Sequence, residues 1–475
     1  MSFDNSRFTF NPWNDYSGVV MEQGRVQLDS DWNEWLAELF RRFQAGTFDA
    51  MGHAAYPATT PFAFQITASS SGGANSLTIG TGRMYIDGLL AENHGLLANA
   101  QWDSALAELS GSPQPPPAAS VNPVDFFSQP HYTPANNSLA GDGPFLAYLD
   151  VWTRPVTYLE DPELIDKAVG VDTTGRLQTV WQVKLMAVPS GGNWNCATPD
   201  SSIPWPVSSG QLTNGTIASG PSGPCCLTNG TGYTGAENQF YRVEIHQAGG
   251  TNALGATGGA TFKWSRDNAS VETGVTSIAN ATNTVGDPAT RLSVLSLGRD
   301  QVLGFIPGNW IEVLDESLYL SGQPGELRQI DSVDVSARTI TLTAPLTAAN
   351  FPVGTPAENT RTRIRRWDHS GKIYEQDGTT VWYDLGAAGS KGDIPVPVAG
   401  TTLILESGIT VTFNLSSAAG TFQTGDFWTF AARTADGSLD PQLTNAPPRG
   451  IHHHYTKLSI VNFNPSSATD CRNPV

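Results

Sequence analysis

The stretch FLAYLDVWTRPVTYL, residues 145–159, decides the fold class, because its side chains alternate in the manner of a β-strand. A strand points successive side chains to opposite faces, so alternation over several residues indicates a strand. RLQTVWQVKLMAV, residues 176–188, has the same pattern, and the acidic segment between the two is predicted to be a loop with one helical turn. These two stretches predict the first pair of strands in a β domain.

Working outward, most of the chain repeats this strand pattern. The segments concerned include NSLTIGTGRMYIDGLLAEN (75–93), ENQFYRVEIHQAG (237–249), NWIEVLD (309–315), TTLILESGITVTFNL (401–415) and HHHYTKLSIV (452–461). Asp87-Gly88 is a turn signal between short strands. We therefore predict a mainly β protein, built from several antiparallel sandwich-like or barrel-like modules, with one N-terminal amphipathic helix at about residues 30–45.

The helix is predicted from QGRVQLDSDWNEWLAELFRRF, residues 23–43. Its apolar residues fall on a single helical face: Trp32, Trp35, Leu36, Leu39, Phe40 and Phe43. Asp29 and Asp31 precede or begin this helix, where its dipole favours negative charge, so helix capping explains them better than catalysis does. The stripe is wider and more aromatic than one small β module requires. We expect it to contact another subunit, with packing on the chain's own core as the alternative.

Composition limits the classes of function. The chain of 475 residues has 44 acidic and 26 basic residues, a net charge of −18, which repels phosphate backbones and argues against nucleic acid as a partner. Only 15% of the residues are charged, whereas glycine (48) and proline (32) are abundant, as in turn-rich β proteins. No signal peptide and no apolar run of membrane-spanning length is present. We expect synthesis in the cytoplasm and no membrane insertion.

The chain is too long for one ordinary domain, so we predict four consecutive regions. Residues 1–107 form a docking segment with the helix and a small β module, and residues 108–143 form a Pro/Gly-rich connection. Residues 144–370 form one or more central β domains with long loops, and residues 371–475 form a C-terminal β region. The four cysteines do not have the spacing of a zinc site. If a disulfide forms, we expect Cys196 to pair with Cys225 or Cys226.

Three polar motifs are candidates for a binding or catalytic site. In IHHHYTKL (451–458), His452 and His454 share one strand face and His453 points to the other, so His452 and His454 are weak candidates for a metal site and no cofactor is predicted. KWSRDN (263–268) resembles a carboxylate or sugar site but fits a hairpin turn better. In RTRIRRWDHSG (361–371), Arg361, Arg363 and Arg365 share a strand face, predicted to meet acids across a subunit or domain boundary, with polyanion binding as the alternative.

No catalytic motif stands out. Glu312, Asp315 and Glu316 could flank a glycosidic bond, but a protein with 44 acids offers such sets by chance. The sequence has no nucleophile elbow, phosphate loop or dinucleotide fingerprint. We therefore expect no enzymatic activity, with polysaccharide degradation as the least favoured alternative.

A family resemblance extends these inferences. The opening SRFTFNPWNDYSGVVMEQGRVQLDSDWNE resembles the start of an uncharacterised family of bacterial proteins encoded with phage-tail-like contractile injection systems. Further matching segments follow in order, namely GRMYIDGLLAEN, AYLDVWTRPVTYLEDP, ENQFYRVEIH, IRRWD, TGDFWTFAART and PPRGIHHHY. The resemblance implies a structural or adaptor component of the tail, baseplate or fibre region of a particle that is released outside the cell. The implied partners are other particle subunits and further copies of this chain, with a cell-surface glycan as the alternative.

Overall fold

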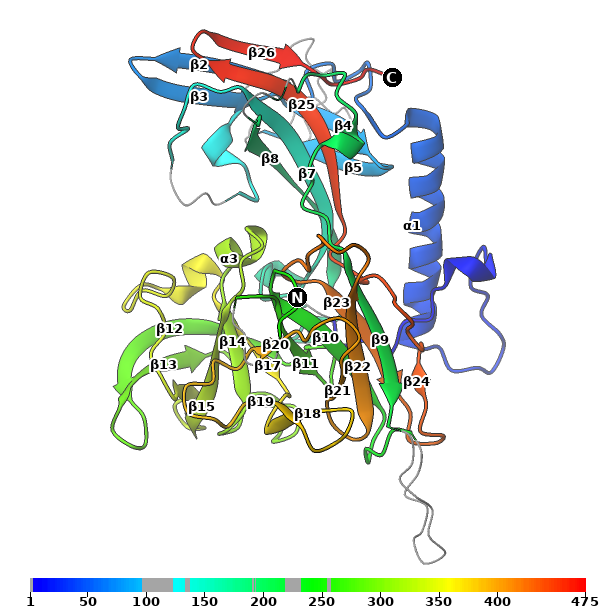
Figure 1. The fold of residues 1–475 in the computed structure, drawn as a ribbon, viewed down its shortest axis with the longest axis vertical. Coiled ribbons are helices and arrows are strands. Elements are labelled where there is room, and N and C mark those ends of the chain that lie inside the picture. Colours follow the sequence, from blue (N-terminus) through cyan, green and yellow to red (C-terminus); the bar gives the residue numbers. More distant parts are fainter. Residues whose placement is uncertain are drawn as a thin grey trace, which may run out of the picture. The chain divides into compact units, whose positions relative to one another are not determined.

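The computed structural model describes residues 3–95, 123–132, 137–189, 192, 194–217, 232–253 and 258–475. These residues form two compact units, each assembled from three segments of the chain (Figure 1). The first unit contains residues 1–7, 155–176 and 206–451, and the second contains residues 8–154, 177–205 and 452–475. This interleaved division differs from the four consecutive regions predicted from sequence. Most of the predicted connection at 108–143 lies outside the described residues.

The second unit is built on a four-stranded antiparallel sheet in the order β26-β25-β7-β8. Its strands are β7 (Phe145–Val156), β8 (Arg176–Ala187), β25 (His453–Phe463) and β26 (Ser466–Asp470). Alternate residues of β7 enter two different cores, because Leu149 and Val151 pack with Trp181 whereas Leu146 and Tyr148 pack in a smaller cluster. The strand that opened the sequence analysis is therefore confirmed, and it is buried on both faces.

Two small sheets and one long helix complete this unit. One sheet has the order β1-β4-β5 and the other β2-β3-β6. The strands are β1 (Ala54–Ala55), β2 (Ile66–Ser71), β3 (Ala74–Ile79), β4 (Gly82–Ile86), β5 (Leu89–Asn93) and β6 (Val124–Asp125). Asp87 and Gly88 join β4 to β5 with φ values of 47° and 79°, as a two-residue hairpin turn requires. Helix α1 spans Asp29–Met51, longer at its C-terminal end than predicted.

The first unit contains a β-sandwich. Its two five-stranded sheets have the orders β20-β11-β10-β23-β24 and β19-β18-β21-β22-β9. Phe262 of one sheet meets Phe413 of the other with ring centroids 4.7 Å apart, inside a shared apolar core. The first sheet contains β10 (Gln239–Gln247), β11 (Thr261–Ser265), β20 (Ile394–Pro395), β23 (Phe427–Ala432) and β24 (Leu439–Asp440). The second contains β9 (Gly210–Thr216), β18 (Lys372–Glu375), β19 (Val381–Asp384), β21 (Thr402–Ile404) and β22 (Ile409–Leu415).

A closed six-stranded barrel, in the order β12-β13-β16-β15-β14-β17, is the other half of the first unit. Its strands are β12 (Glu272–Thr282), β13 (Pro288–Val294), β14 (Trp310–Leu314), β15 (Glu326–Asp334), β16 (Thr339–Leu342) and β17 (Arg363–Trp367). The short helix α3 (Glu316–Leu320) follows β14. The predicted class, mainly antiparallel β with sandwich and barrel modules, is confirmed. Among the described residues, no helix is both long and apolar enough to cross a membrane.

Candidate functional site

The aromatic side chains on the apolar face of helix α1 are exposed to solvent, whereas Leu36 and Leu39 on the same face are half-buried. We call Trp32, Trp35, Leu36, Leu39, Phe40 and Phe43 the α1 stripe. Phe43 is 70% exposed, Trp32 is 54% exposed and Phe40 is 50% exposed. The rings of Trp32 and Trp35 lie against each other, 5.2 Å apart between centroids. An exposed apolar patch of this kind is typical of an interaction surface.

The opposite side of α1 is the covered one. Ser30 and Glu38 are its buried residues, and Glu38 is only 7% exposed. At the start of the helix the Asp31 carboxylate accepts a hydrogen bond from the Leu28 backbone N–H at 3.0 Å, which is one half of a capping box. Asp31 therefore has the structural role predicted from sequence. The helix is thus amphipathic as predicted, and its buried residues, Ser30 and Glu38, do not belong to the α1 stripe.

The C-terminal half of α1 is attached to the β4–β5 turn. The Gln44 side chain donates a hydrogen bond to the Asp87 carbonyl at 3.0 Å. At Gly88, a Cβ atom would lie 2.1 Å from the Gln44 carbonyl oxygen, so only glycine fits this close approach. The turn therefore fixes the position of the helix and of its exposed stripe within the second unit.

Two histidines hold the same carboxylate beside this attachment. His53 Nδ1 lies 2.6 Å from Asp87 Oδ1, and His454 Nδ1 lies 2.8 Å from Asp87 Oδ2. The other nitrogen of His53 lies 3.1 Å from the Tyr455 carbonyl oxygen and 3.5 Å from an oxygen of Asp200. All of these partners are acceptors, so both nitrogens of His53 must donate, and its imidazole is cationic.

The pKa directions agree with this geometry. The hydrogen bond to Asp87 raises the pKa of His53 above its usual value, against the opposing effect of burial. Burial alone would raise the pKa of Asp87, but the hydrogen bonds from His454 and His53 overcome it and lower that pKa. The cluster is a charged link between the end of α1, the β4–β5 turn and β25.

The weak candidates for a metal site, His452 and His454, lie in different surroundings. His454 uses Nδ1 for Asp87, and His452 lies before β25 begins. Within the part of the chain that the structure describes, no three His, Cys, Asp or Glu side chains gather in a group able to hold a metal ion. His453 points to the other face, as predicted, and its Nδ1 lies 2.7 Å from Asp150, which also pairs with Lys184 at 2.7 Å.

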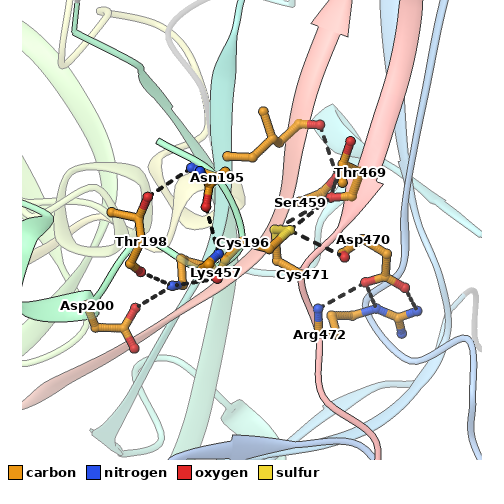
Figure 2. Close-up of a disulfide and its surroundings, with 12 residues drawn as sticks. Asn195, Cys196, Thr198, Asp200, Lys457, Ser459, Thr469, Asp470, Cys471 and Arg472 are labelled. Atoms are coloured by element: carbon orange, nitrogen blue, oxygen red, sulfur yellow. Dashed lines mark hydrogen bonds and ion pairs between the residues drawn. A yellow bond between two sulfur atoms is a disulfide. The ribbon is translucent and has the colours of Figure 1, made fainter. Parts of the chain in front are cut away.

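A polar cavity of about 470 Å³ lies beside this cluster in the second unit. Its lining includes His53, Cys196, Asp200, Lys457, Cys471 and Arg472. Figure 2 shows the disulfide between Cys196 and Cys471, with the Lys457 ammonium near Asp200 and the Arg472 guanidinium against Asp470. Each cation on this wall has a carboxylate partner, so the cavity has no unbalanced charge to attract an ionic ligand.

The disulfide differs from the pairing predicted from sequence. Cys196 bonds to Cys471, 275 positions away, rather than to Cys225 or Cys226, which lie outside the described residues. The reason lies in the path of the chain. After residues 206–451 of the first unit, the chain returns to the second unit, where the end of β26 brings Cys471 beside the 194–205 segment. Lys457 supports the same segment by donating to the Cys196 carbonyl at 3.1 Å.

The arginine cluster also requires a correction. Arg363 and Arg365 are fully buried inside the first unit, so neither can line a surface for another subunit or a polyanion. Arg365 pairs with Glu272 at 2.6 Å, and Arg363 lies 3.5 Å from Glu160. Arg361 lies at an exposed turn with φ 53°, apart from the strand that contains the other two. The acidic partners, which we predicted across a subunit or domain boundary, are therefore residues of the first unit itself.

A buried ionic network occupies the region between the sandwich and the barrel of the first unit. Lys263 Nζ lies 2.7 Å from Glu312 and 3.4 Å from Glu244, and Glu312 also accepts from the Trp367 indole. Burial opposes the charge of Glu312, but Lys263 and His246 outweigh it and hold the pKa of Glu312 well below its usual range. A carboxyl held ionised in this way cannot serve as the general acid of glycoside hydrolysis.

The remaining candidates are structural as well. Asp315 caps helix α3 by accepting from the Leu318 backbone N–H, and Glu316 lies 3.6 Å from Arg363. In KWSRDN, Arg266 forms a double hydrogen bond with Glu406, while burial and the nearby Asp368 raise the pKa of Asp267 to about 6. The predicted solvent-facing hairpin turn is wrong, because Lys263, Trp264 and Ser265 are buried in β11. The rest of the motif leads to β12, which pairs with β13 and β17 rather than with β11.

Two residues of the histidine cluster were missed from sequence. The sequence predicted only a turn at Asp87, and it predicted no role for His53, which lies two residues beyond α1. Asp87 accepts from His454, which is 367 positions away, so no local spacing could reveal the cluster.

Comparison with known families identifies the family of this chain. The sequence matches the model of a family of unknown function, DUF6519, over residues 1–192 and 204–471. The chain belongs to this family. No curated protein and no solved structure matches the chain. The match confirms that the chain belongs to an uncharacterised family.

Proposed function

We propose that this chain is a structural or adaptor subunit of a phage-tail-like contractile injection particle, in its tail, baseplate or fibre region, and that it acts by docking to other subunits. The outward-facing α1 stripe is the observation that carries the proposal. Four aromatic side chains of one helix are exposed to solvent while the polar residue Glu38 is buried. Placing large apolar groups in water is unfavourable in an isolated chain, so the arrangement favours a partner.

Two further features support the same role. The N-terminal arm preceding α1 exposes Trp13, Tyr16, Val20 and Met21, which extends the apolar surface along the chain. The Cys196–Cys471 disulfide suits a protein that functions in an oxidising exterior after synthesis in the cytoplasm, because disulfides persist there. Outside the stripe, Trp205 stacks on Tyr455 inside the second unit, and it supports folding rather than docking.

Replacing Trp35 by glutamate tests the proposal. Because Trp35 is 37% exposed and belongs to the stripe, Trp35→Glu should leave the melting temperature of the isolated chain within about 2 °C, whereas the chain should be lost from purified particles. The readout is the amount of this chain per particle, measured by quantitative mass spectrometry.

Val335→Glu is the matched control, since Val335 is also an exposed apolar residue but lies in the β15–β16 turn of the first unit. Its incorporation should equal that of the unchanged chain. Normal incorporation of Trp35→Glu would contradict the docking role of the stripe, and absence of the unchanged chain from purified particles would contradict the particle assignment itself.

A further inference from the structure

The α1 stripe has a symmetric sequence. Its residues read aromatic, aromatic, leucine, leucine, aromatic, aromatic, and their positions are symmetric about the midpoint between Ala37 and Glu38. Reversing the chain direction about this point places Trp32 at the position of Phe43, Trp35 at that of Phe40 and Leu36 at that of Leu39. A stripe that is the same in both directions is complementary to an antiparallel copy of itself.

From this symmetry and exposure we infer that the stripe pairs with the stripe of a second copy of this chain, as two antiparallel helices about a two-fold axis. The inference rests on the proposed docking function and names its partner. At 3.6 residues per turn, residues 32, 36, 39 and 43 lie within about 60° of one another around the helix. Each would contact the equivalent part of the second copy, as a two-fold interface requires.

The charges at the edge of the stripe fit the same arrangement. In an antiparallel pair about a two-fold axis, each edge of one helix lies beside the same edge of the other. Charged groups on that edge must therefore attract each other, or at least not repel. Asp31 and Arg42 lie on one edge, within about 20° of each other around the helix. About the same midpoint, Arg42 lies two residues from the Asp31 position of the second copy, roughly 3 Å along the axis. Each copy would therefore place its arginine close to the aspartate of the other.

The available area is sufficient for a weak, specific dimer. Four aromatic side chains of roughly 200 Å² each, about half exposed, together with the leucines, offer on the order of 500 Å² per copy. The total of roughly 1,000 Å² reaches the lower limit of specific interfaces. We therefore expect a dissociation constant in the micromolar range, about 1–100 μM.

Sedimentation equilibrium of the full chain between about 1 and 300 μM tests the pairing, a range chosen to span the expected constant. The unchanged chain should shift from monomer to dimer. Trp32→Glu and Phe43→Lys, each at a strongly exposed position, should each weaken dimerisation at least tenfold. The double variant should recover at least half of the lost affinity on a logarithmic scale, because position 32 faces position 43 of the second copy.

The double variant separates the two helix directions. In a parallel pair, position 32 faces position 32 and like charges meet, so the double variant would dimerise no better than either single variant, which would overturn the antiparallel arrangement. Thermal melting of each variant controls for folding. Leu36→Glu with Leu39→Lys provides a second compensating pair, nearer the axis, should either change at the ends affect folding.

The outcomes also separate this inference from the proposed function. A chain that stays monomeric at 300 μM while Trp35→Glu is lost from particles would overturn the two-fold pairing and assign the stripe to a subunit of different sequence. A trimer or hexamer would likewise overturn it. A dimer that is broken by Trp32→Glu, together with normal particle incorporation of that variant, would support the pairing and remove the proposed role of the stripe in particle docking.

Discussion

At the scale of single residues, His53 has the most informative surroundings. One carboxylate faces Nδ1, and a carbonyl oxygen with a second carboxylate faces Nε2, so the proton on each nitrogen has an acceptor. A neutral imidazole has only one N–H group and would leave one of these acceptors without a donor. His53 therefore acts as a fixed cation that joins the end of α1 to β25, and the strength of this link must depend on pH.

We predict that His53→Gln loses stability mainly in acidic and neutral solution. Because the folded-state pKa of His53 is raised above 6.5, its contribution is complete below pH 6.5 and is lost as the pH rises through the folded-state pKa. Asp87 sets the acidic limit, since its lowered pKa adds stability above about pH 3.8 that is lost as the pH falls through its folded-state pKa.

Urea unfolding of both proteins from pH 4 to 9 measures this effect. The difference in unfolding free energy should be below about 1 kcal/mol, because the pair is partly exposed, and it should shrink toward pH 9. Asp87→Asn, which removes the negative charge that both histidines share, should show the same loss of pH dependence. A difference between His53→Gln and the unchanged chain that grows as the pH rises would contradict the assigned charge.

Residue chemistry was only partly predictable from the sequence. The opposite directions of His453 and His454 follow from strand geometry and were predicted correctly. The burial of Arg363 and Arg365 was not, because Glu160 and Glu272, their partners, come from segments about 200 and 90 positions earlier. An arginine-rich strand looks the same in sequence whether its counter-charges are inside or outside the protein.

At the scale of elements, the position of α1 was predicted well, but the sequence left two alternatives for the contact of its apolar face. The 3.6-residue periodicity shows that a helix has an apolar face, yet it cannot show whether that face meets the chain's own core or a partner. In the structure Glu38 is buried and the aromatic residues of the stripe are exposed. The width of the stripe and its aromatic residues were the available signals in the sequence, and they favoured contact with a partner.

The attachment of α1 leads to a matched pair of glycine substitutions. Gly88→Ala should destabilise the chain by about 1–3 kcal/mol, because its φ is +79° and the new Cβ would lie 2.1 Å from the Gln44 carbonyl oxygen. Gly46→Ala should stabilise it by about 1 kcal/mol, since Gly46 lies within α1 and has no atom within 4 Å of the position of a Cβ.

Thermal and urea unfolding of the two variants distinguish these effects. Opposite signs would support both the close approach at the β4–β5 turn and the ordinary helical geometry at Gly46. Equal stability of Gly88→Ala and the unchanged chain would show that the helix is not held by the turn as described.

At the scale of the whole molecule, the two units are interleaved along the chain. The second unit is interrupted by residues 155–176 and 206–451, which belong to the first. Composition and strand patterns predicted a multidomain β protein correctly, because both are properties of local sequence. The interleaving could not be predicted, since it depends on β25 and β26 returning to pair beside β7 after about 300 residues.

The disulfide provides a test at this scale. Cys196→Ser with Cys471→Ser should lower the unfolding free energy by about 2–4 kcal/mol, because the bond restricts a very long loop in the unfolded chain. Adding a reducing agent to the unchanged chain should produce the same decrease in urea unfolding. The double variant should not respond further to reductant, and a full response of the variant would assign the effect to other cysteines.

The same bond closes a covalent ring that contains residues 206–451 of the first unit. A protease that cuts once within this segment, for example after the exposed Lys391, divides the polypeptide but does not release either piece. The cut protein should migrate as one molecule on a denaturing gel without reductant and as two with it. A nicked chain would keep its N-terminal helix covalently joined to its C-terminal strands.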